Sequence, residues 1–186
     1  QFKIEASPED LMFFSFYPTK PVGGIDGGMI VSDDYDKIAH YKEAVLNGMS
    51  YASNNWERTI KFPGWKMYLN SFQGYVANEN LKKLPAKMQR LQEIREMYNE
   101  ALGYNNTSSH LYRIIVKDNN AKMKELKEKG ITTGIHYEAS HIHPVYNQGE
   151  QINLPRSEYV ANSSLSIPFN EALTDKEISY IIECIR

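Results

Sequence analysis

The sequence has one cysteine and no long apolar run. Cys184 stands alone among 186 residues, so no disulfide can form within the chain. No uninterrupted apolar stretch reaches the roughly 20 residues that a membrane-spanning helix needs, and the chain does not open with the pattern of a signal peptide. We therefore expect a protein of the reducing cytoplasm rather than a secreted or membrane protein.

The chain also lacks an excess of either charge. It has 21 basic and 23 acidic residues, which are interspersed and give a net charge of −2. No basic stripe is available to neutralise a phosphate backbone, which argues against nucleic acid as a partner. Hydrophobic residues make up 41% and aromatic residues 12% of the chain. This composition is typical of an ordinary globular protein.

The first half of the chain predicts two strands, one on either side of Lys20, and two helices. Residues 11–16 form a short apolar run, which is typical of a strand buried on both faces. Glycines then lead into a second strand at residues 29–31. Helical spacing of apolar residues follows at 35–45 and again at 67–102. Pro85 is expected to kink or split the longer helix.

The second half alternates strands with helices, which predicts an α/β domain. Strands are expected over residues 111–116, 132–137 and 164–167, with a helix over residues 120–129. A final helix is predicted to begin at Thr174, whose hydroxyl forms a capping box with Glu177.

Lys20 is the residue that most directly suggests chemistry. An amine that is held rigidly and partly desolvated loses some proton affinity, so it can attack a carbonyl or hold an aldehyde cofactor as an imine. The end of a strand, followed by glycines, is a suitable place for such an amine. The plain alternative is a solvated loop lysine, which is the more common role of lysine in a turn.

Four segments of the chain carry a family pattern. The first is Ser15-Phe16-Tyr17-Pro18-Thr19-Lys20, with its glycine-rich sequel. The second is Gly64-Trp65-Lys66-Met67-Tyr68-Leu69-Asn70-Ser71-Phe72-Gln73, and the third is Thr133-Gly134-Ile135-His136-Tyr137, followed by His141 and Tyr146. The fourth joins Leu154-Pro155, Leu165-Ser166-Ile167-Pro168 and Leu173-Thr174-Asp175-Lys176-Glu177-Ile178. In this order they resemble the DegT/DnrJ/EryC1/StrS family of pyridoxal-phosphate (PLP) sugar aminotransferases.

The resemblance implies an α/β protein of the fold-type I aminotransferase class. Residues 1–103 would be the end of the large PLP-binding domain with its long connecting helix, and residues 104–186 the smaller C-terminal α/β domain. Family members carry further cofactor-binding segments upstream of the lysine, so we expect the chain to be an incomplete part of the enzyme. Asp10 is expected to be a turn residue rather than the partner of the cofactor's pyridinium nitrogen. A homodimer with shared active sites is also implied.

The resemblance gives roles to individual residues. Lys20 would hold pyridoxal 5′-phosphate as a Schiff base and carry the proton during transamination. Ser15 would donate its hydroxyl to the cofactor phosphate, and Lys66 would reach the phosphate in the neighbouring subunit. The plain alternatives are a serine tolerated in a strand and a solvated lysine near a helix start. The residues expected to contact the substrate are Tyr17, His141 and Tyr146.

The implied reaction moves an amino group, expected from glutamate, onto a keto group of a nucleotide-linked deoxysugar. Related enzymes that dehydrate sugars have histidine in place of the lysine, so Lys20 favours amination. One alternative is a non-catalytic regulatory or binding module of the same fold. Another is a PLP enzyme that acts on a different ketone or by dehydration.

Three nearby histidines, His136, His141 and His143, raise the question of a metal site. No cysteine is near them, and Glu138 is the only acidic residue between them. The pattern therefore disfavours zinc, and we expect no metal. His136 is expected to be a strand histidine with a hydrogen bond.

Overall fold

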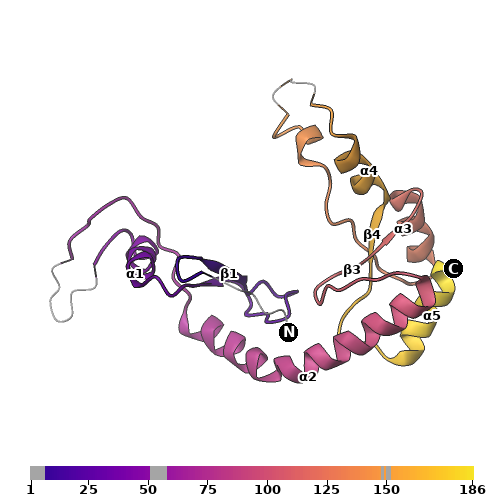
Figure 1. Ribbon diagram of the computed structural model, residues 1–186, viewed down its shortest axis with the longest axis horizontal. Coiled ribbons are helices and arrows are strands. Elements are labelled where there is room, and N and C mark those ends of the chain that lie inside the picture. The colour runs from indigo at the N-terminus through magenta and orange to yellow at the C-terminus, as the bar shows by residue number, and fades with distance from the viewer. Residues whose placement is uncertain (1–6, 51–57, 148, 150–151) are drawn as a thin grey trace. The chain divides into compact units, whose positions relative to one another are not determined.

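The computed structural model describes residues 7–50, 58–147, 149 and 152–186. The chain forms two compact units, Gln1–Leu84 and Pro85–Arg186, here called the first and second units. Helix α2 (Ser71–Leu102) passes through the boundary between them (Figure 1). The expected domain boundary after residue 103 stays a prediction, because a helix shared by two units can be assigned to either.

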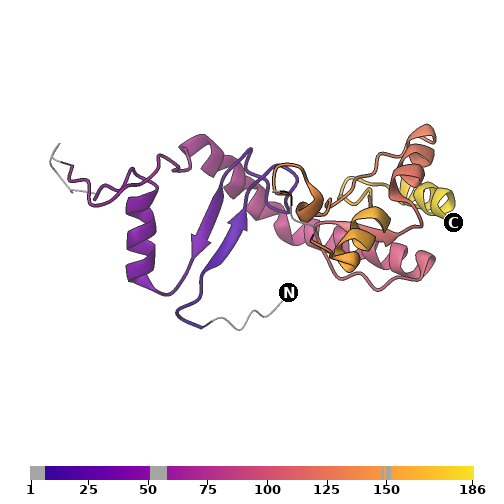
Figure 2. The same ribbon diagram turned by 90° about the horizontal axis from the view of Figure 1, so that it is seen from above.

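The first unit contains a β-hairpin whose connection carries Lys20. Strand β1 (Met12–Ser15) pairs antiparallel with β2 (Gly28–Val31), and the two strands lie side by side in Figure 2. The register places Ser15 opposite Gly28. Both strands that the sequence predicts around Lys20 are therefore confirmed.

The predicted burial of β1 on both faces is wrong for the chain as described. Phe13 is 69% exposed and Phe14 is 44% exposed. Neighbouring side chains of a strand point to opposite faces, and β1 and β2 form a sheet of only two strands among the described residues. Such a hairpin leaves both faces open unless another element packs on them.

Helices α1 and α2 begin at side-chain caps. Asp34 accepts a hydrogen bond from the backbone nitrogen of Lys37 and starts α1 (Tyr35–Ala44). Asn70 and Gln73 cap α2 reciprocally, each side chain accepting from the other residue's backbone nitrogen, at 2.9 and 3.2 Å. This pair fixes the start of α2 at Ser71, four residues later than predicted.

Helix α2 continues through Pro85, so the helix is not split there. Proline removes one backbone donor from the helix. The residues that follow supply compensation, because Leu91, Ile94 and Tyr98 are buried at helical spacing. Apolar packing therefore holds the second half of α2 in place.

The second unit places helices around a small sheet. Its elements are β3 (Tyr112–Ile115), α3 (Asn119–Glu128), the 3-10 helix η1 (Ser140–Ile142), α4 (Pro155–Ser163), β4 (Ser164–Ile167) and α5 (Asp175–Ile185). Strands β3 and β4 pair antiparallel. The strand predicted over residues 132–137 is reduced to one bridge between Gly134 and Ser166. The capping box of Thr174 and Glu177 at the start of α5 is confirmed.

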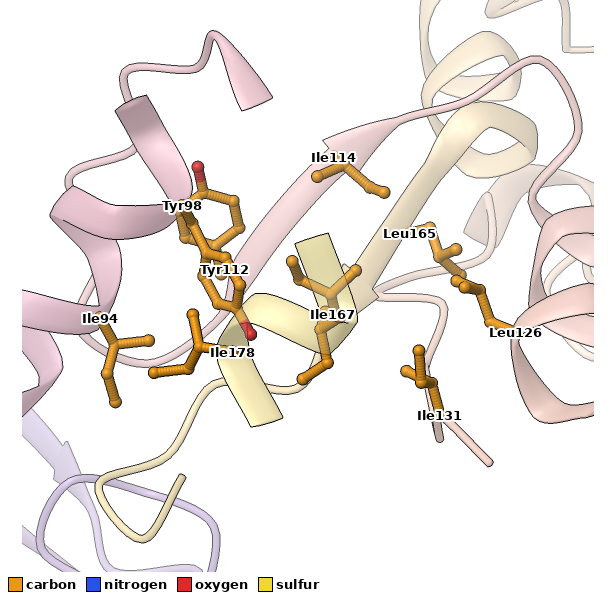
Figure 3. Close-up of a cluster of buried hydrophobic side chains, with 10 residues drawn as sticks. Ile94, Tyr98, Tyr112, Ile114, Leu126, Ile131, Leu165, Ile167 and Ile178 are labelled. Atoms are coloured by element: carbon orange, nitrogen blue, oxygen red, sulfur yellow. The ribbon is translucent and has the colours of Figure 1, made fainter. Parts of the chain in front are cut away.

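A continuous apolar core lies within the second unit (Figure 3). The rings of Tyr98 from α2 and Tyr112 from β3 lie 4.9 Å apart on one side of this core. Burial raises the pKa of Tyr98, whose hydroxyl donates to the carbonyl of Pro168 at 3.0 Å. Leu126 from α3 and Leu165 from β4 close the other side of the core. This core gives the second unit a fixed shape.

Candidate active site

Lys20 lies in the turn that follows β1, in the place that the sequence predicts. Its backbone nitrogen donates to the carbonyl of Tyr17 at 2.9 Å. The nitrogen of Phe16 donates to Gly27, and that of Gly24 donates back to the carbonyl of Phe16 at 2.7 Å. Residues 16–24, here called the lysine turn, therefore form a closed loop of backbone that presents a half-buried lysine.

Two glycines allow this close backbone packing. A Cβ on Gly23 would lie 2.7 Å from the carbonyl oxygen of Pro18. One on Gly28 would lie 2.6 Å from the carbonyl oxygen of Phe14. No side chain fits at either distance, so the glycines after Lys20 are required by the shape of the turn.

Asn80 on α2 also contacts the lysine turn, a contact that the sequence did not predict. Its side-chain nitrogen donates to the carbonyl oxygen of Gly23 at 2.6 Å. No local motif connects the two residues. Helical spacing puts Asn80 one turn after Ala77, on the same side of α2, but it does not indicate Gly23 as the partner.

Ser15 and Tyr17 lie next to the lysine turn or within it. The hydroxyl oxygen of Ser15 accepts from the backbone nitrogen of Tyr17 at 3.3 Å. Because the oxygen is the acceptor, the hydroxyl hydrogen stays available to a phosphate oxygen. Tyr17 is 56% exposed and can meet a ligand. Their contacts with cofactor and substrate stay predictions.

Lys66 lies elsewhere in the first unit, beside the loop that follows α1. Its backbone forms a bridge with Leu46. Its ammonium lies 5.8 Å from the centre of the Tyr68 ring, within the range of a cation–π contact. The reach of Lys66 to the cofactor of a neighbouring subunit stays a prediction.

In the second unit, His141 is held by an acidic residue. Its Nε2 lies 3.0 Å from Oε1 of Glu158 on α4, and its side chain is 8% exposed. The hydrogen bond from His141 lowers the pKa of Glu158. His141 therefore ties η1 to α4, while the direct contact with substrate expected of it stays a prediction.

Tyr146 is 69% exposed, at the end of the segment that contains η1. The same segment borders a cavity of about 280 Å³, whose polar lining comes from Asn120, Glu138, His143 and Asn162. Polar groups around a cavity of this kind can orient a hydroxylated ligand.

The remaining histidine of the cluster has a structural contact. Nδ1 of His136 lies 2.9 Å from the hydroxyl of Ser166, which confirms the hydrogen bond expected for it. Across the residues that the structure describes, no group of three or more His, Cys, Asp or Glu side chains could hold a metal ion.

Asp10 lies in a turn, as predicted, and its side chain accepts a hydrogen bond from the backbone nitrogen of Ser7 at 2.8 Å.

The structure thus brings Ser15, Tyr17 and Lys20 together, and it places His141 and Tyr146 in the second unit. The residues beside β1 fit PLP by their chemistry, since a primary amine can hold an aldehyde and a hydroxyl can donate to a phosphate.

None of the helices in the described part of the chain combines the length and the apolar character that crossing a membrane requires.

Comparison with known proteins identifies the family of the chain. A family model described as the DegT/DnrJ/EryC1/StrS aminotransferase family matches residues 6–186. The chain is 27% identical to the spore coat polysaccharide biosynthesis protein SpsC of Bacillus subtilis, over 95% of this chain and 53% of that protein. It therefore spans about half the length of the curated relatives it matches.

Two solved structures show the same fold at 25% identity. The DegT DnrJ EryC1 StrS aminotransferase from Brucella abortus matches with a TM-score of 0.82, over 95% of this chain and 50% of that chain. The PLP form of Spr1654 from Streptococcus pneumoniae matches with a TM-score of 0.85, over 94% and 50% of the two chains. The chain has the α/β fold of fold-type I aminotransferases, and it belongs to the DegT/DnrJ/EryC1/StrS aminotransferase family.

Proposed function

We propose that the protein is a PLP-dependent transaminase that moves an amino group from glutamate to a keto group of a nucleotide-linked deoxysugar. The observation that carries this proposal is the position of Lys20. It is a half-buried lysine in a closed, glycine-bounded turn at the end of β1, in a chain of an aminotransferase family. Membership of the family supports PLP as the cofactor, as does the match to a PLP-form structure.

Each residue of the candidate site would have its own role in the proposed reaction. Lys20 would hold the cofactor's aldehyde carbon and then, as a free amine, move a proton at Nζ. Ser15 would donate to the phosphate. When bound, the cofactor supplies the electron sink that makes the proton at the substrate carbon removable. The backbone hydrogen bonds of the lysine turn would keep the Lys20 backbone, from which Nζ extends, in one place through both tasks.

A nucleotide-linked sugar is the proposed acceptor because SpsC belongs to polysaccharide biosynthesis. The cavity beside η1 supports it, since amide, carboxylate and imidazole groups line part of that cavity, with apolar side chains around the rest. Lys66 would reach the cofactor phosphate of a second subunit in a homodimer. The single cysteine supports the cytoplasm as the compartment.

The test is nitrogen transfer by the full-length protein. It is supplied with PLP, glutamate labelled with ¹⁵N, and a panel of nucleotide-linked keto-deoxysugars, and the labelled amino sugar is detected by mass. Lys20→Ala should reduce turnover by about 10²- to 10⁴-fold or more, the range expected for loss of an acid–base group. Lys83→Ala, at an exposed site on α2, is the matched control and should leave turnover unchanged.

Three results would contradict the proposal in different ways. If borohydride traps PLP on Lys20 but no labelled sugar forms, the result would indicate a different ketone or a dehydration. No covalent PLP would indicate a non-catalytic module. Full turnover by Lys20→Ala would remove the lysine from the mechanism.

A further inference from the structure

We infer that Asn80 is a positioning residue that fastens the lysine turn to helix α2 and so sets the location of the Lys20 amine. The inference rests on the proposed role of Lys20. It adds a residue from a helix that lies far away in the sequence and carries none of the proposed chemistry. Its basis is a pair of contacts between one side of α2 and the backbone just after Lys20.

The first contact is a hydrogen bond. The side-chain nitrogen of Asn80 lies 2.6 Å from the carbonyl oxygen of Gly23 and is partly buried. A carbonyl oxygen can only accept, so the amide must present its NH₂ group to Gly23. The direction of the bond therefore follows from its partner. Loss of the donor would leave a partly buried carbonyl without this partner.

The second contact is close packing one helical turn earlier. A Cβ on Gly24 would lie 3.0 Å from the Cβ of Ala77 and 3.1 Å from that of Phe16. Ala77 is 6% exposed. Residues three apart share one side of a helix, so Ala77 and Asn80 hold neighbouring residues of the same turn. A small residue and an amide donor together form a two-point attachment.

This attachment lies at Gly23 and Gly24, the end of the lysine turn where its backbone closes. Gly24 donates to Phe16 across the turn at 2.7 Å, and Lys20 donates to Tyr17 within it at 2.9 Å. The turn is thus closed on itself, and Asn80 fixes its position against α2. The hairpin of β1 and β2 cannot fix the position of the turn alone, because a two-stranded hairpin is only marginally stable. Without Asn80, the lysine would keep its local turn but lose its fixed position.

The experiment compares Asn80→Asp with Asn78→Asp in the full-length protein. Asn80→Asp keeps the shape of the side chain but replaces the donor with an oxygen that repels the Gly23 carbonyl. Asn78→Asp makes the same change of charge at an exposed site on the same helix. The first measurement is the rate at which PLP becomes trapped on Lys20 by borohydride, located by peptide mass. The second is hydrogen exchange of the amides in residues 16–24.

We expect Asn80→Asp to slow trapping about tenfold, the order of effect of one lost hydrogen bond. Exchange of the lysine turn should become faster, and kcat should fall with an unchanged KM for the nucleotide-sugar. Asn78→Asp should match the wild type. Asn80→Gln keeps the amide and should restore part of the trapping rate. Asn80→Ala serves as the second test if the aspartate variant does not fold.

Equal trapping and equal exchange in wild type and Asn80→Asp would overturn the inference. A lower melting temperature with an unchanged trapping rate would also overturn it, because it would show a purely structural role. If the wild type itself traps no PLP at Lys20, the proposed function fails. Hydrogen exchange then decides separately whether Asn80 holds the turn, and unchanged exchange rejects it.

Discussion

The two units hold their residues in place by different means. In the second unit, Tyr98, Ile114 and Leu126 are at most 1% exposed and belong to one core. In the first unit, Ala77 is the one buried hydrophobic residue among those that the structure describes, while Phe72 is 67% exposed. The second unit is fixed by apolar packing. The lysine turn is fixed by hydrogen bonds and by glycines in close backbone contact.

This difference separates stability from the proposed chemistry. A core residue can be replaced by another of similar size at modest cost. The lysine turn has no such tolerance, because a Cβ at Gly23 would meet the Pro18 carbonyl oxygen at 2.7 Å. We therefore expect substitutions in the second unit to act on unfolding, and those in the lysine turn to act on Lys20.

The largest effect on stability should come from a buried leucine. Leu126→Ala removes a side chain that is fully buried, whereas Leu81→Ala removes one that is 53% exposed, and both lie in helices. In the 186-residue chain, Leu126→Ala should lower the free energy of unfolding of the second unit by about 2–5 kcal/mol. Leu81→Ala should change the free energy of unfolding of the first unit by less than about 1 kcal/mol. Urea unfolding, followed by hydrogen exchange of peptides from each unit, measures both.

Equal losses from the two leucine variants would break the comparison. They would mean that the first unit has a core of its own, or that the second unit does not depend on the one in Figure 3.

A smaller, pH-dependent effect should distinguish the caps of the two units. The backbone nitrogen of Thr174 donates to Glu177 and lowers its pKa below the ordinary 4.5, while the backbone nitrogen of Lys37 lowers the pKa of Asp34. A lowered pKa adds stability that is present above the ordinary pKa and lost as the pH falls through the folded-state value. Glu177→Gln should therefore lower the melting temperature of the second unit slightly near neutral pH, and the gap should close in acid.

Asp34→Asn is the matched variant in the first unit. Helix α1 has no buried residue, so this change should speed hydrogen exchange in α1 and leave the melting of the second unit unmoved. A gap between Glu177→Gln and wild type that stays constant down to acid pH would contradict the role of the carboxylate charge.

The elements that the sequence predicted well are those set by local patterns. Strand β4, the capping box of α5 and the strands around Lys20 follow from neighbouring residues alone. Helix α4 was missed, although Pro155 at its first turn is a usual start signal. The strand expected over 132–137 failed because strand pairing depends on a distant partner, and only Gly134 found one, in Ser166.

The candidate site, too, was predictable only where a local pattern sets it. The position of Lys20 after a strand and before glycines could be read from the sequence. The contact from Asn80 could not, since it joins residues that no local pattern connects. The exposure of β1 was also hidden, because an apolar run shows that burial is favourable but not what provides it.

The most direct test of the whole account is where PLP becomes attached. The full-length wild-type protein is incubated with PLP, reduced with borohydride and digested, and the pyridoxyl group is located by mass. We predict one modified peptide, carrying the group on Lys20, and no such peptide from Lys20→Ala. Modification of another lysine such as Lys66, or none at all, would contradict the account.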